Sequence, residues 1–196
     1  MQDALVGSWL HESHLSAETL GSLRDLNHRF LDLAATHREW MAGSAMQLST
    51  AQRAAAADCP YALFDLRFQD DAYWRSRLQT LQSWRVADEP LIDDASISFV
   101  RLALFYAWHV ATGAGIKAQL LLGMSACTAA ALRNITVNQL PNLVITEAKH
   151  LSARWNGCAA YWNSLMTAAA QTDRASLRRV QLYGLQLAAA ARLSHS

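Results

Sequence analysis

Apolar residues recur along most of the chain at intervals of three and four, the spacing that places them on one face of an α-helix. The first long pattern follows Ser16, a suitable helix N-cap, and ends at Gly43. Its buried stripe is expected to consist of Leu20, Leu23, Asn27, Phe30, Leu31, Ala34 and Met41. The pattern therefore predicts one long amphipathic helix near the start of the chain.

Shorter helices are predicted from the capping residues that precede them. Ser49 or Thr50 can open an Ala-rich helix that breaks before Pro60, and Asp173 can cap the last helix. Asp70 or Asp71 can cap a helix between them. Its inward face is expected to consist of Trp74, Leu78, Leu81 and Trp84. The segment 61–68 (YALFDLRF) alternates loosely, so a short strand there is possible as well.

The segment 96–112 is apolar on every side of a helix. A helix without a polar face is expected to be buried by neighbours all round, so we predict that this one is central. His109 lies within it, and we expect a buried, hydrogen-bonded core histidine. Gly113 and Gly115 should end the helix.

Together these elements predict an all-α fold, a compact multi-helix bundle with a central buried helix in one domain, residues 1–196. Three prolines, eight glycines and 52% hydrophobic residues agree with this class. The segments 67–78 and 154–165 echo each other, with an arginine and an aromatic residue followed by Tyr-Trp and a leucine. Either the chain contains two pseudo-duplicated halves, 16–86 and 94–172, hinged near Pro90 and followed by a helix 173–193, or aromatic Ala-rich helices merely resemble one another.

Charge and cysteine content restrict location and partners. With 17 basic and 16 acidic residues the formal net charge is +1, so no strong field attracts nucleic acid or an anionic membrane. Cys59, Cys127 and Cys158 are far apart, which favours a reducing compartment over a disulfide framework. The first residues lack a signal-peptide pattern, and the longest apolar stretch, 99–111, is too short to span a bilayer. We expect a soluble cytoplasmic protein.

No catalytic signature stands out. The segment 11–14, H-E-S-H, is one residue short of the zinc-protease motif, and an exposed terminal segment explains it better. His28 and His37 lie on opposite sides of their helix, and no nucleophile elbow or phosphate-binding loop is present. The pairs Asp70-Asp71 and Asp93-Asp94 stand where helices begin, so capping accounts for them. We predict a non-enzymatic protein with no metal and no cofactor.

The segment 125–147 has the lengths of a helix-turn-helix. Thr136 and Gln139 have the spacing of a capping box at the start of the second helix. The candidate contact residues for DNA or a protein partner are Arg133, Asn138, Gln139, Asn142 and Lys149, with Arg133 directed at phosphate and the amides at polar edges. Because basic residues are so few, an ordinary packed helical hairpin is favoured over direct DNA reading.

Several residues in and around this hairpin resemble the FlhD family of flagellar transcriptional co-regulators. They are Leu122-Gly123-Met124, Leu132, Ile135-Thr136, Gln139-Leu140, Leu143 and Arg154-Trp155, together with segment 67–71 and Arg77-Leu78. The resemblance implies an all-helical, dimeric transcription factor that binds DNA together with a zinc-bearing partner protein. This chain is longer and contains the feature twice, so one polypeptide would supply what FlhD supplies as a dimer.

The last helix carries two apolar stripes. Gly184, Ala188 and Ala191 form one of them, and Leu182, Leu185, Ala189 and Leu193 form the other. Two stripes require two partners, which leaves a sandwiched core helix or a self-association surface. The candidate homodimer interface consists of Leu182, Gly184, Leu185, Ala188, Ala189 and Leu193.

The sequence thus predicts a transcriptional regulator or co-regulator of FlhD type, dimeric and acting with a protein partner, with DNA contacted only together with that partner and no membrane involved. A helical adaptor that binds protein without DNA is the first alternative. A small-molecule-binding protein is the second, with a pocket lined by Trp108, His109, Trp155 and Trp162.

Overall fold

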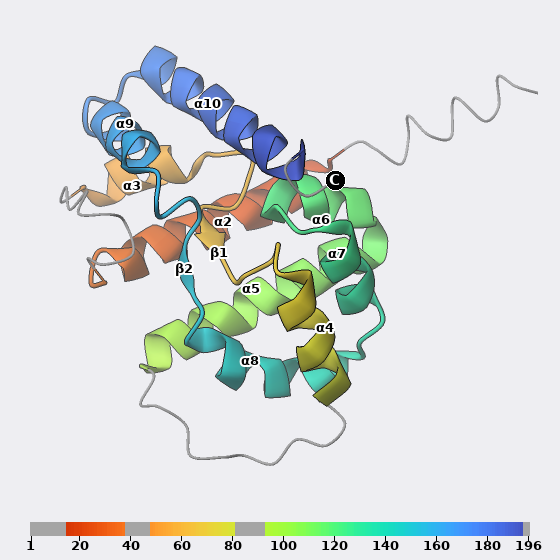
Figure 1. Cartoon of the computed structure of the whole chain (residues 1–196). Helices are drawn as coiled ribbons and strands as arrows, with labels where there is room; N and C mark the ends of the chain where they lie inside the picture. Colours follow the sequence, from red (N-terminus) through yellow and green to blue (C-terminus); the bar gives the residue numbers. More distant parts are fainter. Residues whose placement is uncertain (1–14, 38–47, 81–92, 194–196) are drawn as a thin grey trace, which may run out of the picture.

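The computed structural model describes residues 15–37, 48–80 and 93–193 and is built almost entirely of helices (Figure 1), which confirms the predicted all-α class. The first half contains α2 (Ala17–Ala34), α3 (Thr50–Ala57), strand β1 (Phe64–Asp65) and α4 (Asp71–Thr80). The second contains α5 (Asp94–Gly113), α6 (Gly115–Leu122), α7 (Ala126–Arg133), the 3-10 turn η2 (Val137–Gln139), α8 (Leu140–Ala148), strand β2 (Ser152–Ala153) and α9 (Ala159–Ala170). Helix α10 (Arg174–Leu193) follows, and no described helix is long and apolar enough to cross a membrane.

The predicted caps open the helices as expected. The hydroxyl of Ser16 accepts the backbone N–H of Thr19 at 3.1 Å, and Ser49 forms a capping box with Gln52. Asp70 accepts the N–H of Tyr73 at 2.9 Å in front of α4. Ser125 and Asp173 cap α7 and α10 in the same way. Each cap satisfies a backbone donor that the helix itself leaves without a partner.

Helix α2 ends nine residues before the predicted stop at Gly43, at Ala34. Its last turn tightens, because the N–H groups of Thr36 and His37 bond to Leu33 and Ala34, and the Thr36 hydroxyl also donates to Leu33. The predicted stripe is confirmed from Leu23 to Ala34, whereas Met41 and Gly43 lie outside the described residues.

Helix α5 is central, as predicted, and packs against α2, α6, α7 and α8. It is not buried all round, however. Arg101 and His109 are exposed, and Leu102 is 44% exposed. The prediction of a buried core histidine at His109 is therefore wrong, since the neighbouring helices cover only part of the circumference of α5.

The two short strands pair antiparallel at the centre of the molecule, Phe64 with Ala153 and Asp65 with Ser152. The same number of residues separates Phe64 from Ser152 and Asp65 from Ala153. If each residue is replaced by its counterpart in the other half, the two pairs of the ladder exchange places, so the pairing is symmetric. The echo seen in the sequence thus coincides with an approximate two-fold relation between the strands.

The same offset relates other features of the two halves. Arg67 and Trp155 both have a left-handed backbone, with φ of 57° and 54°. Helices α4 and α9 begin at Asp71 and Ala159, again at this offset. The fully buried pair Trp74 and Trp162 also obeys it, and each indole donates to a backbone carbonyl just before its own helix. Under this relation Arg154 corresponds to Leu66 and not to Arg67, which corrects the alignment of the two arginines suggested by the sequence.

Asn27 joins α2 to the segment that leads into β1. Its side chain is completely buried, donates to the carbonyls of Ala57 and Tyr61 at 3.3 and 2.9 Å, and accepts the N–H of Leu63 at 2.9 Å. One amide therefore satisfies three buried backbone groups that no regular sheet serves.

We predict that Asn27→Ala lowers the free energy of unfolding by about 3 kcal/mol, because it leaves buried backbone groups without partners. Urea denaturation followed by circular dichroism measures this change. The control is Glu18→Ala on the exposed side of the same helix, which should change stability by less than about 0.5 kcal/mol. Equal effects of the two substitutions would contradict the role of Asn27.

Candidate functional site

The helical hairpin formed by α7, η2 and α8 carries the predicted contact residues. Arg133 ends α7, Asn138 lies in η2, Asn142 lies in α8 and Lys149 follows α8; all four are exposed. The spacing of 138, 142, 145 and 149 places these positions on one face of the helix. Ile145 is 37% exposed between the polar residues, and Val137 beside them is 44% exposed. The exposed face therefore mixes amides with aliphatic side chains and includes one basic residue, Lys149.

Gln139 has a different position from the other four. Its amide oxygen accepts the backbone N–H of Thr136 at 2.8 Å, as the predicted capping box requires, and lies 3.1 Å from the Thr136 hydroxyl. Gln139 is half-buried, and its acceptor is already used inside the hairpin. It shapes the turn, and only its amide N–H groups remain for a partner.

The inner face of α8 is held by a buried carboxylate. Glu147 has no exposed surface, and the Tyr73 hydroxyl lies 2.8 and 2.9 Å from its two oxygens. Arg77 donates its Nε–H at 3.2 Å, and the Thr146 hydroxyl lies at the same distance. Burial raises the pKa of Glu147 above its ordinary range, although these partners favour the charged form. This cluster fixes α8 against α4 and so orients the outer face of the hairpin.

The raised pKa of Glu147 predicts a pH dependence of stability. Between the unfolded value of about 4.3 and the higher folded value, the folded protein binds more protons than the unfolded chain. The free energy of unfolding should therefore decrease as pH rises through this window. Urea denaturation at a series of pH values should show a shallower decrease for Glu147→Gln, and parallel curves for the two proteins would refute this account.

The two apolar stripes predicted for helix α10 differ in burial. The Gly184 stripe faces the rest of the domain, and the Leu182 stripe is exposed. Gly184 is buried against the domain, where an added Cβ would lie 2.0 Å from the Tyr61 hydroxyl oxygen, and Ala188 is half-buried. Leu182 and Leu185 are 55% and 43% exposed, and Ala189 is exposed as well. Gly184 therefore cannot belong to a homodimer surface, because the monomer itself occupies its side of the helix. The side chain of Leu193 lies outside the described part.

The predicted tryptophan-lined pocket is not formed by the four residues expected. Trp162 is completely buried in the core, and Trp108 donates its indole N–H to the Ile135 carbonyl at 2.9 Å. Trp155 lines a cavity in which most of its neighbours are polar. The fold thus buries Trp162, leaves His109 exposed on α5 and places Trp155 at a cavity wall, so the four side chains do not share one pocket.

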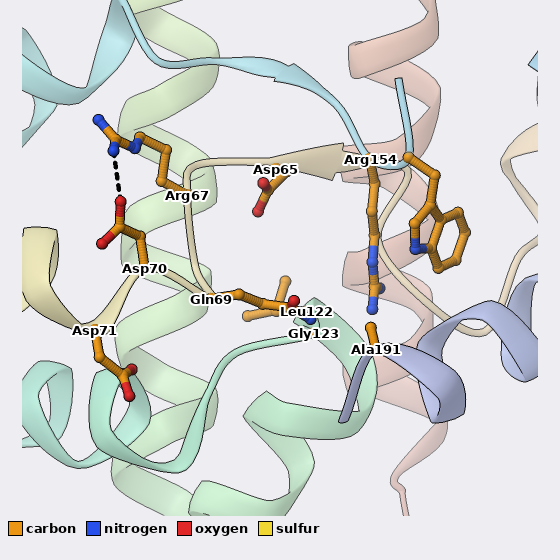
Figure 2. A pocket seen from close by; sticks show the side chains of 10 residues that line it. Asp65, Arg67, Gln69, Asp70, Asp71, Leu122, Gly123, Arg154 and Ala191 are labelled. Atoms are coloured by element: carbon orange, nitrogen blue, oxygen red, sulfur yellow. Dashed lines mark hydrogen bonds and ion pairs between the residues drawn. The ribbon is translucent and has the colours of Figure 1, made fainter. Parts of the chain in front are cut away.

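That cavity has a volume of about 540 Å³ and lies between the end of β1, the end of α6, the residues after β2, and α10 (Figure 2). Its lining residues are Asp65, Arg67, Gln69, Asp70, Asp71, Leu122, Gly123, Arg154, Trp155 and Ala191. Both halves of the molecule and the last helix contribute to its wall.

Arg154 is the most unusual residue of this wall. It is only 5% exposed, its guanidinium lies 4.5 Å from the centre of the Trp155 ring, and Nη1 donates to the Leu121 carbonyl at 3.4 Å. Gly123, with φ of 70°, gives it room, because a Cβ there would lie 2.2 Å from Nη2. Within the described part of the chain, Arg154 forms no ion pair with a carboxylate.

The carboxylates of the cavity differ in how they are engaged. At the rim, Asp70 is ion-paired with Arg67 (Figure 2). Asp71 accepts the Ser125 hydroxyl. Asp65 lies deeper, accepts the Phe68 N–H at 3.2 Å, and has its pKa raised by burial. The interior therefore contains one cation, Arg154, and one carboxylate, Asp65, that are not paired with each other.

Sequence reasoning did not select Arg154 or Asp65 as site residues. Arg154 entered only the internal echo and the FlhD resemblance, because nothing in the local pattern distinguishes a buried arginine from an exposed one. Among the described residues, no group of three or more His, Cys, Asp or Glu side chains is placed to hold a metal ion. The segment 11–14, with its two histidines, lies outside the described residues. No family model, curated protein or solved structure matches this chain.

Proposed function

We propose that this chain is a non-enzymatic transcriptional regulator or co-regulator of FlhD type, which acts as a dimer and with a protein partner in the cytoplasm. The observation that carries the proposal is the exposed outer face of the hairpin α7–η2–α8. It presents the exposed residues Arg133, Asn138, Asn142 and Lys149, and the inner side of α8 is fixed by Glu147. A rigid helix with exposed amides is suited to contact another macromolecule.

The composition of this face favours a co-regulator over a protein that binds DNA alone. Val137 and Ile145 expose aliphatic surface beside the amides, which suits a protein contact better than a phosphate backbone. The chain as a whole has a net charge of only +1. Most of the phosphate contacts would then come from the partner protein, since affinity for DNA depends on neutralising many phosphates.

The two-fold relation between the halves supports a gene duplication that fuses two FlhD-like units. Helix α3 of the first half packs on α9 of the second, while α4 of the first packs on α7 and, through Tyr73, on α8 of the second. Each half thus completes its core with helices of the other. In this proposal one polypeptide supplies the intertwined unit that the FlhD resemblance implies for two chains.

A helical adaptor that binds protein without DNA is the second candidate function. The exposed Val137 and Ile145 favour it, because aliphatic side chains at the centre of a polar rim are typical of protein interfaces. The two candidates share the same surface and differ in whether Arg133 and Lys149 meet phosphate.

The test uses the full chain isolated from its host together with any partner that co-purifies. Retention of host DNA is measured at a series of salt concentrations for the wild type and for the double variant Arg133→Ala/Lys149→Ala. If both residues contact phosphate, the variant should bind more weakly, and the slope of log K against log salt should decrease by about 2.

The matched control is Arg75→Ala/Arg101→Ala, which removes two exposed arginines elsewhere on the surface and should leave the slope unchanged. Unchanged affinity and slope in the Arg133→Ala/Lys149→Ala variant would exclude DNA contact by this surface. A stable complex with a partner but without salt-sensitive DNA retention would support the adaptor.

The dimer is proposed to form through the exposed side of α10. Replacing Leu182 and Leu185 with Glu should convert a dimer to a monomer in sedimentation velocity, because charges would be buried at the interface. Leu102→Glu, which places the same charge at an exposed leucine of α5 outside the proposed interface, is the control and should remain dimeric. A wild type that sediments as a monomer at all concentrations would exclude this interface.

A further inference from the structure

The charge of Arg154 is not required by the fold. The two-fold relation between the halves places Leu66 at the corresponding position, where the leucine is completely buried. An apolar side chain therefore fits this place in the architecture. A guanidinium at the same depth is costly unless an anion and further hydrogen bonds compensate it.

The protein supplies only part of that compensation. Arg154 has five N–H donors. The hydrogen bond to Leu121 is long, at 3.4 Å, and Trp155 contributes only its ring face, at 4.5 Å. Within the described residues no carboxylate forms an ion pair with the guanidinium, and Asp65 acts on it only at longer range. Donors of Arg154 thus remain available on the side that borders the cavity, beside Gly123 and Ala191 (Figure 2).

Asp65 supplies the complementary group. Its carboxylate extends into the same space from β1, as Figure 2 shows. Backbone N–H groups of the turn after β1 favour its charged form, yet it keeps lone pairs toward the cavity. The cavity therefore offers a planar cationic donor and an anionic acceptor on its wall.

We propose that this cavity binds a small organic acid that carries a hydrogen-bond donor beside its carboxylate, of the α-amino or α-hydroxy acid class. The ligand carboxylate pairs with the guanidinium of Arg154, a geometry that arginine favours. The neighbouring ammonium or hydroxyl group donates to Asp65. The volume of about 540 Å³ lies in the range of small-molecule sites.

The charges of the wall select this class over phosphate. Asp65, Asp70 and Asp71 place three carboxylates around the cavity against the two arginines 67 and 154. A dianion would be repelled by this excess, whereas a monoanion with its own donor matches Arg154 and Asp65 together. The inference does not depend on the proposed regulatory function, since the hairpin surface is formed by other residues.

The experiment is a titration of the full chain with α-amino acids, α-hydroxy acids, simple carboxylates without the α-donor, and inorganic phosphate. Calorimetry gives affinities, and the midpoint of thermal unfolding gives stabilisation. We expect at least one acid with an α-donor to raise the unfolding temperature in a concentration-dependent way, and its matched simple carboxylate to bind about tenfold or more weakly. Comparing the affinities of the α-amino acids with those of the α-hydroxy acids shows whether the site prefers an ammonium or a hydroxyl group as the donor.

Two variants locate the site. Asp65→Asn should weaken the α-donor ligand about tenfold while leaving the simple carboxylate almost unchanged, and Arg154→Met should abolish binding of both. Arg75→Gln, on the exposed side of α4, is the control and should bind like the wild type. Should Arg154→Met fail to fold, the Asp65→Asn comparison decides alone.

The proposal is overturned if no α-amino or α-hydroxy acid binds at millimolar concentration, or if Asp65→Asn binds the ligand as tightly as the wild type does. Preference for phosphate over every acid would also overturn it, because the acidic wall should disfavour a dianion.

Discussion

This structure depends on hydrogen bonds that satisfy the buried backbone groups around the paired strands β1 and β2. Two strands of two residues each cannot provide hydrogen bonds for their flanks, so other elements must. The side chain of Asn27 in α2 accepts the backbone N–H of Leu63. The carbonyl of Leu121 at the end of α6 accepts the N–H of Ala62 at 2.7 Å, and the backbone N–H of Arg154 donates to the carbonyl of Leu63 at 2.8 Å. The paired strands thereby join the two halves. Helix α4 follows β1 along the chain, and α9 follows β2.

The charged residues of the cavity lie in or next to the two paired strands. The left-handed residues just beyond the strands, Arg67 and Trp155, line the same cavity as Asp65 and Arg154. On the other side of α4, Tyr73 and Arg77 reach Glu147 and hold α8. Helix α4 therefore takes part in both sites. Its first residue, Asp71, lines the cavity, and its residues Tyr73 and Arg77 hold the hairpin.

The division between interior and surface bears on function. The hairpin exposes amides and aliphatic side chains on a rigid support, which suits contact with a macromolecule. The cavity offers an arginine and a carboxylate within a volume of about 540 Å³, which suits a small molecule. Because the cavity wall includes both halves and Ala191 of α10, occupation of it would bind these parts together and favour their present arrangement.

The sequence by itself determined the features that depend on near neighbours along the chain. Periodicity gave the helices and the buried Asn27, and short polar residues gave the caps at Ser16, Ser49, Asp70 and the Thr136–Gln139 box. Only the tertiary structure decided which sides of these helices are covered. It left His109 exposed and turned Gly184 against Tyr61, and it buried Arg154 beside a cavity. The physical reason is that a hydrogen bond within one turn is set by local spacing, whereas burial depends on distant segments that local spacing does not identify.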